Sequence, residues 1–293
     1  MLRTNHRYFE RNMEPIRLPN AIVAGAPKCG TSSLYFWLAA HPEVCASPVK
    51  ETFFFADEVN RFNKTANIRE HSLDDYAVYF EKCHKAPIRL EATAPYIYYQ
   101  NALQHIPGLP SQPKLLFVLR EPSARLYSQY RFERFRTKRI TEDWATYAQR
   151  KELWLHGDYM HYLQPWLEAL GPERMHVSTF EALVQDPQAS LQSMAAFLGI
   201  DPSFYATYSF VQHNETVAIK NKKFHRLGLA FQRYVPHPLQ EALLPLYLRL
   251  NAGKMPQKDP GDKGITARVK QDYAASVHAL AKAFPTLDLT PWA

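Results

Sequence analysis

The sequence predicts an α/β fold with a parallel sheet flanked by helices, built as a single domain over residues 1–293. Two observations lead to this prediction. Short apolar runs alternate with longer helical patterns along the chain, and no long linker or internal repeat divides it. Hydrophobic residues make up 46% of the chain and charged residues 22%, which is typical of a globular protein and excludes a disordered or fibrous one.

The expected strands are short apolar runs. Residues 20–26 (NAIVAGA) and 114–119 (KLLFVL) have the pattern of buried strands. Three shorter strands are expected at residues 44–46, 88–92 and 174–179. Because helices separate successive strands, the strands should lie parallel. Residues 1–19 are interpreted as a polar lead-in to the first strand.

Helical patterns fill the intervals between these strands. They are expected at residues 31–41, 73–83, 123–136, 158–170, 187–198, 224–234, 239–250 and 266–284. Proline and glycine mark several of the ends, since Pro42 follows the first helix, Pro122 opens the basic third one, and Gly171 and Gly199 close two others. The segment between residues 48 and 55 is expected to be an aromatic-rich loop.

Charge and cysteine content narrow the class of protein. The net charge of +7 fits an anionic ligand, but the basic residues are dispersed and no nucleic-acid motif is present. Cys29, Cys45 and Cys83 are an odd number without a C-x-x-C spacing, so we expect no disulfide framework, no metal site and a reducing compartment. No apolar run reaches the ~18 residues of a membrane span, and the first residues lack a signal-peptide core.

A glycine pair brackets the first candidate site. Gly25 and Gly30 flank Lys28 between the first expected strand and the first helix, where backbone N–H groups can hold a phosphate. The G-x4-G spacing matches the start of a Walker A loop, but Thr31 and Ser32 stand where that loop has lysine and a hydroxyl residue. A lysine inside the loop suits a single 5′-phosphate and the group leaving from it. The alternative is an ordinary strand–turn–helix with a surface lysine.

The second candidate site follows the strand at residues 114–119. Arg120 comes at its carboxyl end, which is where open α/β sheets bind ligands, and Ser128 lies eight residues further on. An arginine fork and a serine hydroxyl suit a second phosphate. The alternative is an ion pair of Arg120 with Glu121 and a surface hydroxyl at Ser128.

Two separated phosphate sites indicate a doubly phosphorylated nucleotide, and the two motifs resemble those of sulfotransferases that use 3′-phosphoadenosine 5′-phosphosulfate (PAPS). Residues 26–34 (APKCGTSSL) are similar to the family's 5′-phosphosulfate loop, and residues 116–130 to its 3′-phosphate motif. The resemblance implies a P-loop nucleotide-kinase-like sheet, a metal-free reaction, and PAPS as the sulfuryl donor with adenosine 3′,5′-bisphosphate as the product. The implied cofactor-binding residues are Lys28, Cys29, Gly30, Thr31, Ser32, Ser33, Arg120, Ser128 and Lys222.

The resemblance also implies the catalytic residues. Residues 50–55 (KETFFF) are similar to the K-E-x-x-F-F element of the heparan sulfate and bacterial branch, which places Glu51 as the general base. Three phenylalanines just downstream would partly desolvate its carboxylate. Lys28 is the expected stabiliser of the transition state and of the leaving phosphate. A histidine is the second candidate for the base. The non-catalytic alternative is that Lys50 and Glu51 form an ordinary ion pair at the surface.

One departure from the branch concerns residues 91–96 (EATAPY), which resemble its E-K-[ST]-P-x-Y element but carry Ala92 in place of the lysine. Lys50 or a residue of the basic helix is the expected substitute, from the set Arg125, Arg131, Arg134 and Arg136. A basic cluster, formed by Lys220, Lys222, Lys223 and Arg226, lies where family members close a loop over the 3′-phosphate.

The resemblance leaves the acceptor open: a carbohydrate, a lipid or another small molecule, with a hydroxyl or an amine as the attacking group. We expect a soluble, cytoplasmic, bacterial enzyme with no nucleic-acid partner, since the chain lacks the membrane stem of Golgi relatives. Two other functions fit less well. One is a P-loop kinase or NTPase, and the other is a non-catalytic module that binds polyanions through the net charge.

Overall fold

The structure, a computed structural model, describes residues 17–211, 218–221, 243, 246–247, 250–257 and 262–293. A five-stranded sheet lies at its centre, in the order β2-β3-β1-β4-β5, and every pairing in it is parallel. The strands are β1 (Ala21–Gly25), β2 (Val44–Ala46), β3 (Ile88–Ala92), β4 (Lys114–Leu119) and β5 (Met175–Thr179). The predicted parallel α/β fold is therefore confirmed.

The two clearest apolar runs form the middle of this sheet. All five residues of β1 are buried, and so are Leu115 to Leu119 of β4. β1 pairs with β3 on one side and with β4 on the other, with Ala21 opposite Leu90 and Lys114. A strand that is paired on both edges and covered on both faces has only apolar surroundings, which explains the unbroken apolar sequence.

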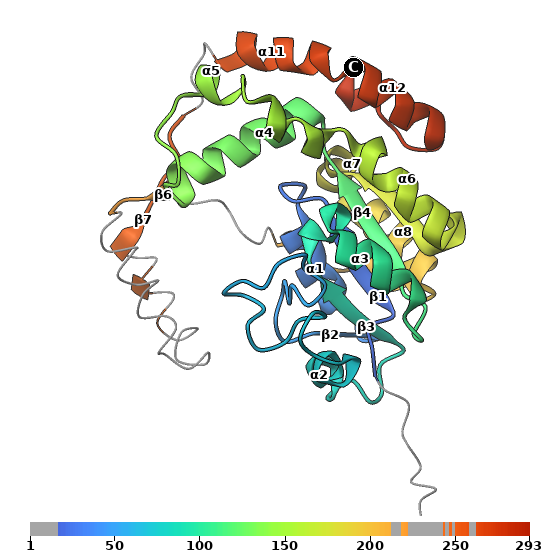
Figure 1. The fold of residues 1–293 in the computed structure, drawn as a ribbon. Helices are drawn as coiled ribbons and strands as arrows, with labels where there is room; N and C mark the ends of the chain where they lie inside the picture. The colour runs from blue at the N-terminus through green and yellow to red at the C-terminus, as the bar shows by residue number, and fades with distance from the viewer. Residues whose placement is uncertain (1–16, 212–217, 222–242, 244–245, 248–249, 258–261) are drawn as a thin grey trace, which may run out of the picture.

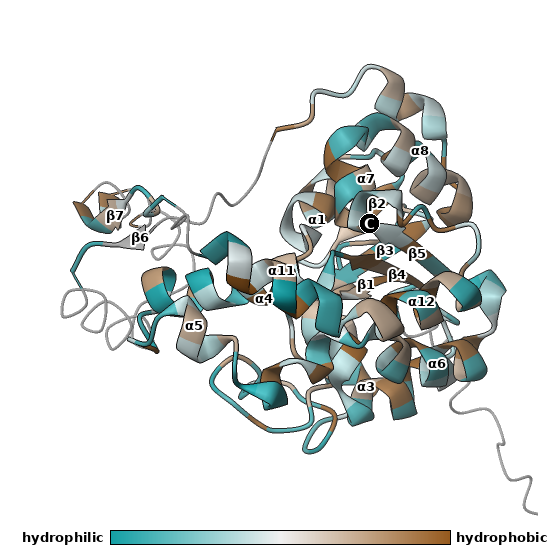
Figure 2. Ribbon diagram, turned by 90° about the horizontal axis from the view of Figure 1, so that it is seen from above, coloured by the Kyte–Doolittle hydropathy of each residue, from teal (hydrophilic) through white to brown (hydrophobic). Residues whose placement is uncertain are grey.

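Helices cover both faces of the sheet (Figure 2). One face is covered by α1 (Thr31–Ala39), α7 (Phe180–Gln185) and α8 (Pro187–Leu198), and the other by α3 (Gln100–His105), α6 (Tyr159–Leu170) and α12 (Ala274–Ala283). Short 3₁₀ turns join them, at Val78–Phe80, Ala94–Tyr98, Ile106–Gly108, Lys151–Leu153, Leu155–Gly157, Pro172–Arg174, Pro202–Ala206 and Thr290–Trp292. None of the helices in the described part of the chain is long and apolar enough to cross a bilayer.

A second group of helices projects beyond the sheet (Figure 1). α4 (Pro122–Arg131) packs against α5 (Trp144–Tyr147) and α11 (Asp262–Asp272) around a small aromatic core that includes Tyr130 and Tyr273. The last turn of the predicted 123–136 helix is a π-helix, Phe132–Arg136. The predicted 266–284 helix is two helices, α11 and α12, which meet at Tyr273.

Several other elements differ from the sequence prediction. The 73–83 pattern yields a short α2 (Leu73–Ala77), opened by a Ser72–Asp75 capping box, and a 3₁₀ turn. A two-stranded antiparallel ribbon, β6 (Ala218–Ile219) with β7 (Ala252–Gly253), was not predicted. The predicted helix at 224–234 lies outside the described residues, as does most of the one at 239–250.

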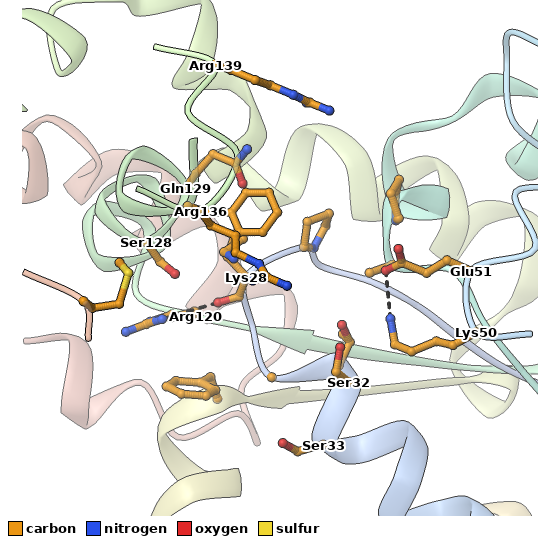
Figure 3. A pocket seen from close by; sticks show the side chains of 18 of the residues that line it. Lys28, Ser32, Ser33, Lys50, Glu51, Arg120, Ser128, Gln129, Arg136 and Arg139 are labelled. Atoms are coloured by element: carbon orange, nitrogen blue, oxygen red, sulfur yellow. Dashed lines mark hydrogen bonds and ion pairs between the residues drawn. The ribbon is translucent and has the colours of Figure 1, made fainter. Parts of the chain in front are cut away.

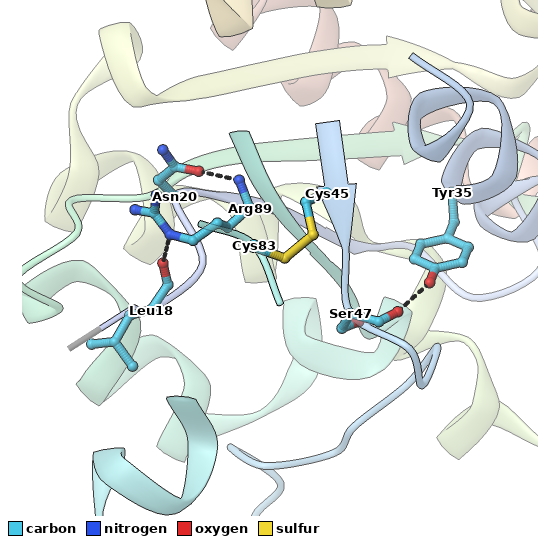
Figure 4. Close-up of a disulfide and its surroundings, with 7 residues drawn as sticks. All are labelled: Leu18, Asn20, Tyr35, Cys45, Ser47, Cys83 and Arg89. Carbon is cyan, nitrogen blue, oxygen red and sulfur yellow. Dashed lines mark hydrogen bonds between the residues drawn. A yellow bond between two sulfur atoms is a disulfide. The ribbon is translucent and has the colours of Figure 1, made fainter. Parts of the chain in front are cut away.

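The expectation of unpaired cysteines is wrong. Cys45 on β2 and Cys83 form a disulfide, with their Cα atoms 5.5 Å apart (Figure 4). Spacing could not reveal the pair, because the two cysteines are 38 positions apart and the chain between them is mostly loop. The prediction of a reducing compartment rested on unpaired cysteines, so this disulfide removes its basis. Cys29 is left as a free, buried thiol.

Candidate active site

The first predicted motif forms a tight loop between β1 and α1. Gly30 occupies the N-cap position of α1 with φ of 80°, and a Cβ there would come within 2.9 Å of the Phe180 ring. Glycine is required on both counts. Lys28 also has a positive φ, of 73°. The loop therefore brings the first N–H groups of α1 and the side chains of Thr31, Ser32 and Ser33 to the carboxyl edge of the sheet.

The second motif lies beside the first. Arg120 follows β4, and its Nη1 donates to the carbonyl oxygen of Lys28 at 3.4 Å, while its guanidinium stacks on Phe180 at 4.5 Å. Its Nε is buried without a hydrogen-bond partner. Glu121 does not pair with Arg120 but caps α4, accepting from the backbone N–H groups of Ser123 and Ala124 at 2.9 and 2.8 Å.

One cleft of about 1540 Å³ contains both motifs (Figure 3). Arg120 and Ser128 lie on one side of Lys28, and Lys50 and Glu51 on the other. Among the described residues that line the cleft, seven carry a cationic side chain: Lys28, Lys50, Arg120, Arg136, Arg139, Lys220 and Lys254. Glu51 is the single carboxylate in the same set. The cleft is therefore suited to a ligand with several negative charges.

Lys28 occupies the middle of the cleft with little solvent around it. Its Nζ lies 4.0 Å from the centre of the Phe132 ring. Burial, and then the positive charge of Arg120, lower the pKa of Lys28 to about 8. Both effects disfavour the charged form of Lys28. An anion beside its Nζ would compensate for them and would therefore bind favourably.

Glu51 is held at the edge of the cleft by backbone and ionic contacts. Its N–H donates to the carbonyl of Ala92 at the end of β3 at 2.8 Å, and its φ is 62°. The carboxylate accepts from Lys50 Nζ at 2.8 Å and keeps 37% of its side-chain surface exposed. Of the three phenylalanines that follow, Phe54 and Phe55 are fully buried in the core, whereas Phe53 lines the same cleft as Glu51.

A buried carboxyl next to Glu51 had no role in the sequence prediction. Glu91 lies at the end of β3, where Thr93 and Thr52 donate to its Oε1 at 2.5 and 3.0 Å. Its Oε2 is buried without a partner. Burial raises the pKa of Glu91 to about 7, although the two hydroxyl hydrogen bonds act in the opposite direction. Thr52 also contacts the Tyr96 hydroxyl at 3.2 Å, so this network anchors the loop that presents Glu51.

One of the predicted binding residues, Cys29, does not line the cleft, and another lies outside the described part of the chain. Cys29 is fully buried, its Sγ contacts the carbonyl of Pro27, and its N–H donates to the carbonyl of Ala26. Lys222 lies outside the described residues. All the others line the cleft, at Lys28, Gly30, Thr31, Ser32, Ser33, Glu51, Arg120 and Ser128.

Of the possible substitutes for the lysine replaced at Ala92, Lys50 and Arg136 line the cleft. Arg131 and Arg134 instead donate to the backbone carbonyls of Pro256 and Glu142. Arg139 and Lys254 also line the cleft but were not predicted. Arg139 is placed there by the segment that follows α4, and Lys254 by the β6–β7 ribbon, and neither arrangement follows from a local sequence pattern. Their basic character was the only available signal.

No group of three or more His, Cys, Asp or Glu side chains among the described residues is placed to hold a metal ion.

Comparison with known proteins places these features in a family. A family model described as "Sulfotransferase domain" matches residues 18–232. The chain is 26% identical over 205 residues to a human bifunctional heparan sulfate N-deacetylase/N-sulfotransferase 3, covering 64% of this chain and 23% of the relative. It is 28% identical over 203 residues to a mouse heparan sulfate glucosamine 3-O-sulfotransferase 3B1, covering 64% of this chain and 49% of the relative. The chain thus spans half or less of the length of these curated relatives.

Solved structures agree with the fold. A sulfotransferase from Alicyclobacillus acidocaldarius has a TM-score of 0.59 and 25% identity, covering 74% of this chain and 93% of that one. A sulfotransferase domain from the curacin biosynthetic pathway has a TM-score of 0.51 at 17% identity, covering 88% and 98%. The family model covers well over half of the residues. The chain therefore belongs to the sulfotransferase domain family.

Proposed function

We propose that this protein is an enzyme that transfers the sulfuryl group of PAPS to a hydroxyl or amine of an acceptor. The observation that carries the proposal is the convergence of two phosphate-binding motifs and one carboxylate in a single cleft of about 1540 Å³. The family supports the reaction class, and the chemistry of the cleft supports the donor. The relatives named for heparan sulfate favour a carbohydrate acceptor.

The residues present fit this donor. Lys28, Thr31, Ser32 and Ser33 would hold the 5′-phosphosulfate at the start of α1, where glycine at position 30 leaves room for a close approach. The buried, unpartnered Nε of Arg120 offers a donor for a second phosphate, together with the hydroxyl of Ser128. Cys29 would support the phosphate-binding loop from its buried, core-facing side. Lys222 stays a prediction for the 3′-phosphate.

When bound, the donor supplies an activated sulfuryl group, and the protein's part is positioning and electrostatics. Glu51 would take the proton of the acceptor from the side of the cleft opposite Arg120. Lys28 would stabilise the negative charge that develops on the leaving 5′-phosphate oxygen. Lys50 donates to the Glu51 carboxylate at 2.8 Å, and it would take the place of the lysine missing at Ala92.

The experiment that tests the proposal has a binding arm and a turnover arm. Adenosine 3′,5′-bisphosphate should raise the melting temperature, whereas ATP with Mg²⁺ should not. Incubation with PAPS and a panel of carbohydrate, lipid and phenolic acceptors should then give a product 80 Da heavier, about the mass of one sulfuryl group in place of a proton, seen by mass spectrometry.

Other outcomes would decide for other functions. Stabilisation by ATP–Mg²⁺ alone would favour a phosphotransferase. Salt-dependent binding to heparin or nucleic acid without any use of PAPS would favour a non-catalytic polyanion-binding module. Either result would overturn the proposed sulfuryl transfer.

A further inference from the structure

Arg125 is a buried cation of α4 (Pro122–Arg131) that the proposed reaction does not use. Its side chain is 3% exposed, and its Nε has no hydrogen-bond partner. The four ion pairs found in the described part of the chain do not include it. A buried charge without an opposite charge beside it destabilises a fold, so its presence requires an explanation.

The groups around the Arg125 guanidinium are neutral. Its strongest electrostatic neighbours are Tyr98, Tyr159, Cys29 and Tyr273. The three tyrosine hydroxyls donate to the backbone carbonyls of His156, Arg120 and Trp154, at 3.0, 2.7 and 2.8 Å. Because each hydroxyl proton is already used, the tyrosines can offer the guanidinium only oxygen lone pairs. This cage solvates the arginine without cancelling its charge.

The ionisable groups further out form no ion pair with Arg125 in the described part of the chain. Burial, and then Arg125 itself, lower the pKa of His156 to about 4, so this histidine is neutral at physiological pH. Glu121 and Asp158 act on Tyr273 from a distance. The carboxylate of Glu121 is already engaged by the start of α4, where it accepts from two backbone N–H groups and the Ser123 hydroxyl.

Arg125 lies close to the phosphate loop but does not line the cleft. Its charge affects both Lys28 and Cys29, which belong to that loop, yet Arg125 is not among the residues that line the cleft. Tyr159 links the two regions, because its hydroxyl lies within the electrostatic influence of Arg125, accepts from the N–H of Arg120 and donates to the carbonyl of Arg120. The unpaired charge is therefore placed directly behind the two phosphate motifs.

We propose that Arg125 is a positioning residue that gives the phosphate loop a fixed positive potential from behind, at a cost to the stability of the ligand-free protein. In a low-dielectric interior this potential reaches the cleft with little screening by salt. The bound anionic ligand would then supply the negative charge that no carboxylate of the described residues supplies to Arg125 as an ion-pair partner. The inference rests on the proposed donor site and adds a residue that never touches the ligand.

The test compares Arg125→Met, which removes the charge and keeps much of the volume, with Arg125→Lys, which keeps the charge. Lys282→Met, on the exposed face of α12, removes one charge far from the loop and is the matched control. For Arg125→Met we expect an unchanged or higher melting temperature without ligand, and binding of adenosine 3′,5′-bisphosphate weaker by on the order of tenfold. Arg125→Lys and Lys282→Met should bind nearly as the wild type does.

A pH profile separates an electrostatic role from a structural one. The charged or ionisable groups that act on Lys28 are Arg120, Cys29, Glu51 and Arg125, and Arg125 lowers its pKa. Removing Arg125 should therefore move the alkaline limb of bisphosphate binding to higher pH, whereas a loosened loop would weaken binding equally at every pH.

Each outcome decides the inference. Wild-type-like affinity in Arg125→Met, or equal weakening in Arg125→Lys, would overturn the electrostatic role. An Arg125→Met protein that is less stable or fails to fold would refute the stability cost, and Arg125→Gln against Arg125→Lys would then decide the binding claim. If the wild type itself does not bind the bisphosphate, it is the proposed function that fails.

Discussion

Lys28 is a lysine whose surroundings oppose its own charge, since burial and Arg120 bring its pKa to about 8. Below that pH the side chain is charged and above it neutral. A bound anion favours the charged form, so binding of adenosine 3′,5′-bisphosphate should weaken above pH 8 and take up a proton there. Calorimetry at pH 8.5 in two buffers of different ionisation enthalpy measures this uptake.

Lys28→Ala is the control for that measurement and a test of catalysis. The variant should bind the bisphosphate without proton uptake at pH 8.5, and its kcat should fall by about 10²–10³ if it acts as a lost transition-state donor does. An unchanged rate in a folded variant would exclude Lys28 from the chemical step.

Glu51 is the proposed base and the single carboxylate among the described residues that line the cleft, and it pairs with Lys50. Glu51→Gln keeps the shape and removes the proton acceptor, so turnover should be lost while the bisphosphate binds as before. Single-turnover assays and calorimetry on the same preparation separate the two effects. Sustained turnover by Glu51→Gln would transfer the role to another group, with a histidine next in order.

At the scale of the element, the loop after β2 depends on Thr52, which is 1% exposed. Its hydroxyl donates to Glu91 and accepts from the N–H of Phe54. Thr52→Val should reduce the free energy of unfolding by about 1–3 kcal/mol, because it leaves buried polar groups unsatisfied. It should also lower kcat by displacing Glu51. Urea titration of Thr52→Val beside Thr52→Ser, which keeps the hydroxyl, would show no difference if the network did not matter.

The elements that could be predicted from sequence are those whose patterns are set locally. β1 and β4 are nearly continuous apolar runs. α8 begins at Pro187, directly after its N-cap residue Asp186, and is closed by Gly199 as expected. Tertiary contacts decide the others. The π-helix after α4 and the β6–β7 ribbon have no local signature, and they carry Arg136 and Lys254 to the cleft.

The candidate site follows the same division. Lys28 and Arg120 could be predicted because parallel strands end at one edge of the sheet. The burial of Glu91 and Arg125 could not be predicted, although Arg125 was among the candidate substitutes for the missing lysine, because it depends on the residues that the fold packs around them. Glu91 is a buried carboxyl that accepts hydrogen bonds from two threonines, and Arg125 is a buried guanidinium with tyrosines among its neighbours.

At the scale of the whole molecule, the Cys45–Cys83 disulfide closes a segment that carries Glu51, Thr52 and α2. In the chain-entropy model, a loop of 38 residues contributes about 4 kcal/mol to the free energy of unfolding. Reductant should therefore lower the urea midpoint of the wild type and leave that of the Cys45→Ser/Cys83→Ser double variant unchanged. Identical midpoints for the wild type with and without reductant would show that the bridge does not stabilise the fold.

The strand order has a consequence for the charges in the cleft. β1 lies between β3, which holds the backbone of Glu51, and β4, which is followed directly by Arg120. Two strand spacings, together about 10 Å, therefore separate the carboxylate side from the guanidinium side. If the two strands were neighbours, these groups could pair and neutralise one another. Held apart by β1, the Glu51 carboxylate pairs with its neighbour Lys50 instead, and the Arg120 guanidinium is left to meet an incoming anion.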